Sequence, residues 1–377
     1  MRGSLRERSP GVWEVRVETG RDPVSGRRRQ LSRSVRGTKR EAETVLNRLV
    51  KEADDGTHTG SEATFKDVAD RWLLISSADL SPTTTRRYRG LLDKHILPAI
   101  GSRAAHKIRT TDLDDLYLGL IHQSGLSPAS VRQVHATIRR ALSQAVRWGW
   151  IATNPAANTT PPRVQAPKIT PPDVAEVVKL LDAAAETSPD FARFLHLAVT
   201  TGARRGELCA LRWERIDWKA RTLIISRSVV EVAGGLVEKD TKTHSIRRIA
   251  LDPQTLRVLA AHCRAMAERA ALAECDLGPR GYVFTHDPAG AMPWTPDHVT
   301  KSFQRLRDAT GLKAVRLHDL RHFAATRLLA AGVPVRTVSG RLGHANAATT
   351  LGVYAHFVEA SDHAAAASLA RDLSKGR

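Results

Sequence analysis

The sequence has few cysteines and lacks several common motifs. Three cysteines are present among 377 residues, and their positions, Cys209, Cys263 and Cys275, form no Cys-x-x-Cys pair, which excludes a zinc framework and a disulfide scaffold. No Gly-x-x-x-x-Gly-Lys-Ser/Thr loop and no paired-carboxylate cluster is present, so we expect no ATP, no Mg²⁺ and no other metal or cofactor. No apolar run reaches about 18 residues and the Arg-rich N-terminus lacks an apolar export segment, so we expect a cytoplasmic protein without a membrane partner.

Acidic residues are outnumbered by basic ones. The chain has 58 Lys and Arg against 39 Asp and Glu, a formal net charge of +19, and a pI near 10.6. Such an excess predicts a polyanionic partner, and nucleic acid is the first candidate. A cationic surface that serves solubility, or that contacts acidic lipid, is the alternative.

The length favours two or three domains, and residues 1–60 form the first candidate unit. Apolar and charged residues alternate over 13–17, as in a half-buried strand, and a second strand is expected over 29–35. Thr38 and Glu41 then have the spacing of a capping box that opens a helix. A small α+β unit is predicted.

Residues 61–158 have helical signals only. Apolar residues such as Val131, Val134 and Ile138 recur at helical spacing, and the Ser-Pro step at 127–128 is typical of a helix start. Opposite the apolar stripes lie arginines that could contact phosphates along a duplex. They are Arg86, Arg87, Arg89, Arg132, Arg139 and Arg140. A solvated helix face without a ligand is the alternative.

Residues 159–173 are rich in proline, which predicts a linker rather than a helix or a central strand. Residues 174–377 follow as the last unit. Strand signals over 222–251 lie between helical segments, which indicates an α+β, mainly helical domain.

Two motifs in this last unit carry polar groups at fixed offsets. Residues 201–208 read Thr-Gly-Ala-Arg-Arg-Gly-Glu-Leu. Further on, His318-x-x-Arg321 is followed by a Leu-Gly-His step ending at His344 and, ten residues later, by Tyr354. The spacing of His318 and Arg321 places both side chains on one face of a helix.

These motifs resemble those of the tyrosine recombinases, the phage integrase family. They occur together, in order and at the family's usual separations. The resemblance extends more weakly to the rest of the chain, and it implies a small α+β arm-type DNA-binding domain at 1–60, an all-α core-binding bundle at 61–158, a linker at 159–173 and a catalytic domain at 174–377. For the first of these, a small basic β-hairpin with no DNA site of its own is the alternative.

The implied chemistry is displacement of a 5′-oxygen from a DNA phosphodiester, which concentrates negative charge in the transition state. Arginine suits this charge because its planar fork donates two parallel hydrogen bonds. The arginines that match the family are Arg204, the first of the pair with Arg205, and Arg321. Tyr354 matches the nucleophile, and a phenol with a pKa near 10 needs proton removal and nearby positive charge to react.

The remaining matches concern proton transfer and orientation. His318 and His344 would assist at the phenol or at the phosphate, and the sequence does not divide these roles. Lys242, just before an expected strand, would give a proton to the leaving oxygen, with Lys239 as its competitor. Glu207 would orient basic side chains, and a glutamate on the helix surface is the alternative.

The resemblance therefore implies a site-specific recombinase that integrates or excises a mobile element through a 3′-phosphotyrosyl intermediate. Its implied partners are duplex DNA attachment sites, further copies of itself in a synaptic homotetramer, and accessory DNA-bending or directionality proteins. A type IB topoisomerase that relaxes supercoils and a non-catalytic DNA-binding regulator are the alternatives. The N-terminal unit favours the recombinase over the topoisomerase, and the six filled catalytic positions give the regulator no support.

Overall fold

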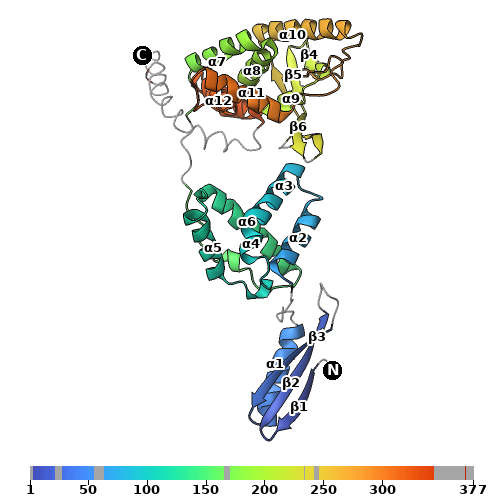
Figure 1. Ribbon diagram of the computed structural model, residues 1–377, viewed down its shortest axis with the longest axis vertical. Coiled ribbons are helices and arrows are strands. Elements are labelled where there is room, and N and C mark those ends of the chain that lie inside the picture. The colour runs from blue at the N-terminus through green and yellow to red at the C-terminus, as the bar shows by residue number, and fades with distance from the viewer. Residues whose placement is uncertain are drawn as a thin grey trace. The chain divides into compact units, whose positions relative to one another are not determined.

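A computed structural model of the chain divides into two units, Met1–Ala166 and Pro167–Arg377 (Figure 1). The structure describes residues 3–21, 28–54, 63–164, 170–232, 234–241, 246–343 and 370. The division falls inside the proline-rich segment 159–173. Among the described helices, none combines the length and the apolar character needed to cross a membrane.

The N-terminal part is a three-stranded sheet covered on one face by a helix. Its elements are β1 (Gly3–Ser9), β2 (Val12–Arg21), β3 (Arg28–Arg36) and α1 (Lys39–Asp54). The strands are antiparallel in the order β1-β2-β3. Val15 and Val17 of β2 are buried against Ala42 and Leu49 of α1, which confirms the predicted apolar face, although Glu14 between them and Trp13 is buried as well. The capping box of Thr38 and Glu41 at the start of α1 is confirmed.

The second part of this unit is a helical bundle, as predicted. Its elements are α2 (Phe65–Ser76), α3 (Pro82–Leu91), η1 (Leu92–Ile96), α4 (Leu97–Ile100), η2 (Ala105–Lys107), α5 (Thr110–His122), α6 (Pro128–Arg147) and η3 (Pro155–Ala157). Ser127 caps α6 by accepting a hydrogen bond from the backbone of Ser130. Val131, Val134 and Ile138 of α6 are fully buried, so this helix lies in the middle of the bundle's core.

The described residues of the C-terminal unit are mainly helical with two small antiparallel sheets, which confirms the α+β prediction. Its elements are α7 (Val174–Thr187), α8 (Pro189–Thr201), α9 (Arg205–Cys209), η4 (Trp213–Arg215), β4 (Ile216–Asp217), β5 (Thr222–Ile225), β6 (Arg227–Val232), β7 (Gly235–Asp240), β8 (Arg247–Ala250), α10 (Pro253–Leu272), α11 (Pro296–Ala309), α12 (Asp319–Ala330) and α13 (Val335–Leu342). One sheet has the order β4-β5-β8, and β6 with β7 forms a hairpin.

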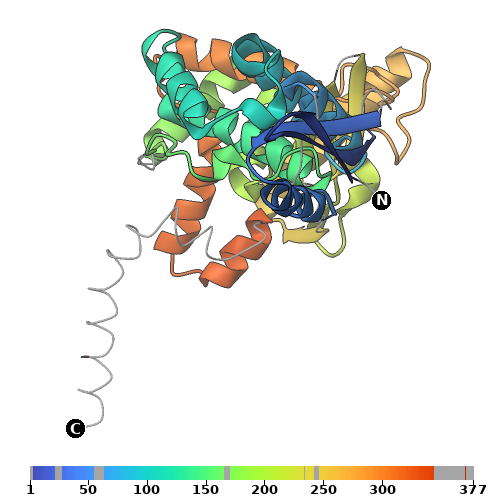
Figure 2. The same ribbon diagram turned by 90° about the horizontal axis from the view of Figure 1, so that it is seen from below.

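Close packing among the helices brings distant parts of this unit together. An aromatic cluster of Phe194, Phe284 and Trp294 anchors α8 in the core. Helix α12 contacts both α8 and α13, and the orange-red α12 and α13 are seen side by side in Figure 2. The end of α8, the start of α12 and the end of α13 are the segments from which the candidate site is built.

Candidate active site

The turn between α8 and α9 presents Arg204. Helix α8 ends at Gly202, whose φ of 62° is left-handed and suits glycine. A Cβ atom there would lie 2.5 Å from a methyl carbon of Leu342, so the turn lies directly against α13. Arg204 then caps α9: its backbone N–H donates to Glu207 Oε2 at 2.8 Å, and its Nη1 donates to Oε1 at 2.9 Å.

Glu207 is buried between two arginines. Its exposed fraction is 2%, and that of Arg247 is 7%, which rules out a helix-surface glutamate. Arg247 Nη1 and Nη2 donate to the two carboxylate oxygens at 3.2 and 2.5 Å. Burial alone would raise the pKa of Glu207, but the hydrogen bonds and charge of Arg247, followed by those of Arg204, lower it below its ordinary value.

Arg247 is a site residue that the sequence reasoning missed. It begins β8, where inward and outward positions alternate, and it shares the inward side with buried Ile249. The alternation of side chains along the strand was the sequence signal that could have identified Arg247, because it places this charged residue on the same buried face as Ile249. Arg247 Nε also donates to the backbone carbonyl of Arg341 at 3.0 Å, which ties β8 to α13.

Helix α12 brings Arg321 and His318 to the turn between α8 and α9. Arg321 is 4% exposed, and its Nη1 donates to the carbonyl of Gly202 at 2.6 Å. His318 stands at the N-terminus of α12 with its ring 5.0 Å from that of His322. His318 is exposed, and partial desolvation, followed by the charges of His322, Arg321 and Arg204, lowers its pKa to about 4. At neutral pH its imidazole is uncharged.

The end of α13 meets Arg204. Gly343 closes the helix with a φ of 69°, and its carbonyl accepts a hydrogen bond from Arg204 Nη2 at 3.2 Å. The next residue in the chain is His344. The structure thus brings together Arg204, Glu207, His318 and Arg321, whereas the predicted site residues His344, Tyr354 and Lys242 lie outside the described residues.

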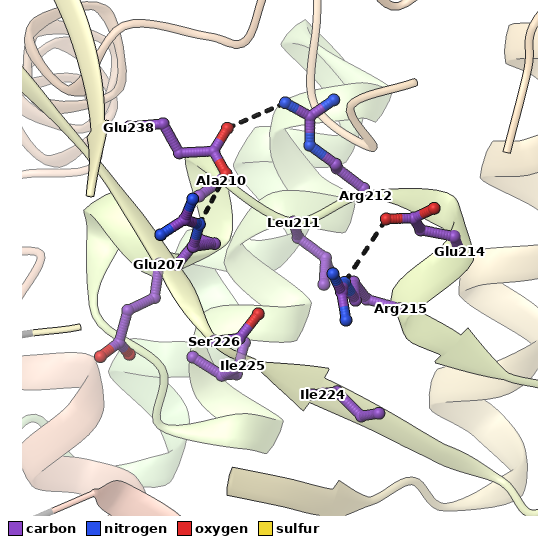
Figure 3. Close-up of a pocket in the computed structure, with 11 residues that line it drawn as sticks. Glu207, Ala210, Leu211, Arg212, Glu214, Arg215, Ile224, Ile225, Ser226 and Glu238 are labelled. Atoms are coloured by element: carbon purple, nitrogen blue, oxygen red, sulfur yellow. Dashed lines mark hydrogen bonds and ion pairs between the residues drawn. The ribbon is translucent and has the colours of Figure 1, made fainter. Parts of the chain in front are cut away.

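The β6–β7 hairpin, which leads toward Lys242, is anchored by a polar cluster. The guanidinium of Arg212 lies 3.9 Å from the ring centroid of Tyr282, and both side chains donate to Glu238 Oε2, at 2.8 and 2.6 Å. Figure 3 shows Glu238 facing Arg212, with the carboxylate of Glu207 pointing away from it. Lys239, the competitor of Lys242, is paired in register with Ser228.

Each of the three described tyrosines is engaged elsewhere. Desolvation and then Glu238 raise the pKa of Tyr282 to about 12, so this phenol stays protonated. Tyr117 is buried, with its hydroxyl 3.2 Å from His135 Nδ1, and desolvation raises its pKa as well. Tyr88 stacks against Arg140 in the helical bundle.

The helical bundle carries a basic groove between α2, α3 and α6. Arg132, Arg139 and Arg140 line it together with Tyr88, over whose ring Arg140 lies at 5.5 Å. Arg147 lines it as well. Guanidinium groups beside an aromatic ring suit phosphates and bases.

The other three predicted arginines lie apart from this groove or at its edge. Arg87 lines a smaller hollow beside it with Arg140, and Arg86 is exposed on α3. Arg89 is paired with Asp70 at 2.8 Å and with Asp93 at 3.6 Å, so its charge is already compensated within the protein.

No cluster of three or more His, Cys, Asp or Glu side chains in the described ranges is arranged to hold a metal ion. The groups that the site does offer are hydrogen-bond donors with fixed positive charge. Arg204 and Arg321 meet at one turn beside an uncharged imidazole, an arrangement that fits an anionic tetrahedral group such as a phosphate.

Comparison with known families agrees with both halves of this description. The model named "Phage integrase family" matches residues 173–360. The model named "Phage integrase, N-terminal SAM-like domain" matches residues 64–121, within the helical bundle.

Curated relatives match over most of their length. An integrase of Saccharopolyspora erythraea is 27% identical over 88% of this chain and 88% of its own length. The ICEBs1 integrase of Bacillus subtilis (strain 168) is 26% identical over 94% of this chain and 95% of its own length.

Solved structures share the fold. The Tn1549 transposon integrase in complex with transposon right end DNA matches with a TM-score of 0.66 and 20% identity, covering 81% of this chain and 99% of that one. A lambda integrase tetramer bound to a Holliday junction matches with a TM-score of 0.58 and 20% identity, covering 90% of this chain and 95% of that one.

Proposed function

Since this chain belongs to the phage integrase family of tyrosine recombinases, and is therefore a site-specific DNA recombinase, we propose that it integrates or excises a mobile element by forming a 3′-phosphotyrosyl ester through Tyr354. The observation that carries this proposal is the convergence of Arg204 and Arg321, from distant motifs, on the turn at Gly202. Two guanidinium groups beside an uncharged imidazole suit a phosphodiester whose charge grows during displacement.

The proposed reaction proceeds without an energy source. The phenolic oxygen of Tyr354 attacks phosphorus while the bond to the 5′-oxygen breaks, and Arg204 and Arg321 bind the non-bridging oxygens. His318 is uncharged and exposed, which supports a role in accepting the phenolic proton or in hydrogen bonding to the phosphate. Lys242 gives the leaving 5′-oxygen its proton. Because the ester retains the energy of the broken bond, a 5′-hydroxyl from another strand rejoins the DNA by the reverse reaction.

His344 and Glu207 complete the proposed set. The hydrogen bond from Arg204 to the carbonyl of Gly343 supports a place for His344 close to the phosphate, where it would bond an oxygen. Glu207 orients Arg204 through two hydrogen bonds.

We further propose the division of labour along the chain. Residues 1–60 bind arm-type DNA, residues 61–158 bind the core site, residues 159–173 link the two halves, and residues 174–377 catalyse. Arg132, Arg139 and Arg140 are the core-site contacts that the basic groove supports, and Arg87 lies at its edge. Arg86 and Arg89 are weaker candidates.

Duplex attachment sites are the proposed DNA partners, and four copies of the chain would assemble on them. A lambda integrase tetramer bound to a Holliday junction, which shares this fold, supports that assembly. Accessory DNA-bending or directionality proteins would choose between integration and excision. The reaction would take place in the cytoplasm.

The test uses a duplex taken from the DNA junctions that flank the encoding gene, nicked close to the cleavage point. Loss of the short nicked fragment prevents rejoining, so the covalent protein–DNA adduct accumulates and runs as a shifted band under denaturing conditions. Tyr354→Phe should abolish the adduct. Tyr117→Phe, which removes the hydroxyl of a tyrosine buried in the helical bundle, is the matched control and should retain it. A Tyr354→Phe protein that still forms the adduct would refute the proposal.

Recombination of two short duplexes distinguishes the proposed recombinase from a topoisomerase. A recombinase joins strands of the two duplexes into products of new length. A topoisomerase only relaxes a supercoiled plasmid. If the protein relaxes the plasmid without joining the two duplexes, and its adduct depends on Tyr354, then the proposed phosphotyrosyl chemistry stands. In that case the protein is a topoisomerase and the proposed recombinase function is wrong.

A further inference from the structure

Arg247 joins three parts of the candidate site that are far apart in the sequence. Its guanidinium grips Glu207 with two hydrogen bonds, and Glu207 in turn holds Arg204. On its other side it lies against the end of α13: a Cβ atom on Gly343 would be 2.9 Å from Arg247 Nη1 and 3.2 Å from Cζ. Arg247 Nε also bonds the carbonyl of Arg341.

The end of α13 is held from a second direction by Arg341. Its Nη2 donates to the carbonyl of Thr200 at 2.8 Å, and its Nη1 donates to that of Ala250 at 3.1 Å. These bonds connect α13 to the end of α8 and to the end of β8. The carbonyl of Gly343, which Arg204 contacts, therefore sits in a framework in which Arg247 is the buried central charge.

Stability alone gives little reason for a charged pair at this position. Desolvating two charges offsets most of their mutual attraction, and well-packed apolar side chains of similar volume commonly do as well or better. An arginine–carboxylate pair does provide directional bonds that hold a neighbouring group at a fixed angle. Here that neighbouring group is Arg204.

We propose that Arg247 is a positioning residue for the recombination reaction. Through Glu207 it aims the guanidinium of Arg204 at the scissile phosphate, and through Gly343 and Arg341 it sets the point from which the chain continues to His344. The inference rests on the proposed function, because it assigns a role within the same site. In this role Arg247 acts through Glu207 and the end of α13 rather than on the phosphate itself.

The test compares cleavage of two nicked substrates by the full-length protein at saturating DNA. One has a normal scissile phosphate, and the other has a methylphosphonate, in which a methyl group replaces one charged oxygen. Arg247→Met should slow cleavage of the phosphate about 10- to 100-fold, somewhat less than the loss of a direct charge-stabilising donor. The dissociation constant for DNA should stay within about twofold.

The methylphosphonate substrate distinguishes loss of Arg204 positioning from a general loss of activity. A neutral phosphorus centre needs less help from Arg204, so the deficit of Arg247→Met should shrink to a few-fold at most, and Arg204→Ala should give the same pattern as a reference. Arg247→Lys, which keeps the charge without the planar fork, should show a smaller deficit of the same kind. Arg248→Met removes a charge from the exposed side of the same strand and should cleave both substrates at close to the normal rate.

Equal deficits on both substrates, or normal cleavage of the phosphate by the Arg247 variants, would overturn the inference. If Arg247→Met does not fold, Arg247→Lys decides by the same comparison. Adduct formation by the unmodified protein distinguishes failure of the proposed function from failure of the positioning role alone. If it forms no adduct, the proposed function fails; if it does and the Arg247 variants behave as Arg248→Met does, only the positioning role fails.

Discussion

Replacing Glu207 with glutamine should destabilise the C-terminal unit strongly. The carboxylate accepts hydrogen bonds from the backbone N–H and Nη1 of Arg204 and from both terminal nitrogens of Arg247. Glutamine keeps the shape but removes the charge, and it places an N–H₂ group where arginine donors converge. Arg247 then remains as a buried cation without a counter-ion.

The magnitude follows from the unequal exposure of the two arginines. The side chain of Arg204 is 25% exposed and that of Arg247 only 6%, so water can replace Glu207 at Arg204 but hardly at Arg247. An exposed pair is worth about 0–1 kcal/mol, whereas removing one partner of a buried pair costs about 3–5 kcal/mol. The expected loss is therefore about 4 kcal/mol. Adding Arg247→Met removes the stranded charge and should recover about 2 kcal/mol.

Native-state hydrogen exchange in rising urea, read by mass spectrometry on peptides from α8 and β5, reports the free energy of unfolding of this unit within the full chain. Glu214→Gln, at an exposed glutamate paired with Arg215, should change it by less than about 0.5 kcal/mol. The reasoning is refuted by a loss below about 1 kcal/mol for Glu207→Gln, or by a double variant less stable than the single one.

Three further predictions concern other parts of the molecule. Arg140→Ala should weaken DNA binding for all sequences and reduce the slope of log affinity against log salt by about 1. Arg89→Ala, which removes a charge already paired with Asp70, should leave that slope unchanged. Equal slopes for the two variants in titrations at several salt concentrations would contradict this prediction. NMR of labelled histidine should give His318 a pKa near 4. Because that value is below the unfolded one of about 6.5, the contribution of His318 to stability is complete above pH 6.5 and is lost as the pH falls toward 4; a His318 titration near 6.5 would refute it. Gly202 has a φ of 62°, and an added Cβ would lie 2.5 Å from a methyl carbon of Leu342 in α13. Gly202→Ala should therefore lower the free energy of unfolding by at least about 1–2 kcal/mol, measured in urea, and an unchanged value would contradict this prediction.

Local signals predicted the secondary structure well because they act within a few residues. The Ser-Pro step at 127–128 does begin α6, and the alternation over 13–17 does form a strand with one buried face. The i,i+3 spacing of His318 and Arg321 holds at the start of α12. Capping, proline geometry and side-chain periodicity are all properties of a short stretch of chain.

The family motifs likewise predicted Arg204, Arg321, His318 and Glu207 as site residues, because each lies in a short pattern with its own spacing, and the structure brings these four together. Their contacts were beyond the reach of spacing. The bond from Arg204 to Gly343 spans 139 positions, and nothing near either residue in the sequence specifies it. The catalytic roles of Tyr354 and Lys242 remain predictions, since both residues lie outside the described residues.

By itself, the sequence determined the elements and the basic character of the protein, and it predicted which side chains react. Only the tertiary structure decided which charges are paired. Arg247 and Arg89 look alike as isolated basic residues on a strand and a helix, yet one is buried against Glu207 and the other bonds Asp70 near the surface. The physical reason is that a charge's energy depends on its burial and on partners many residues away, and long-range packing sets both.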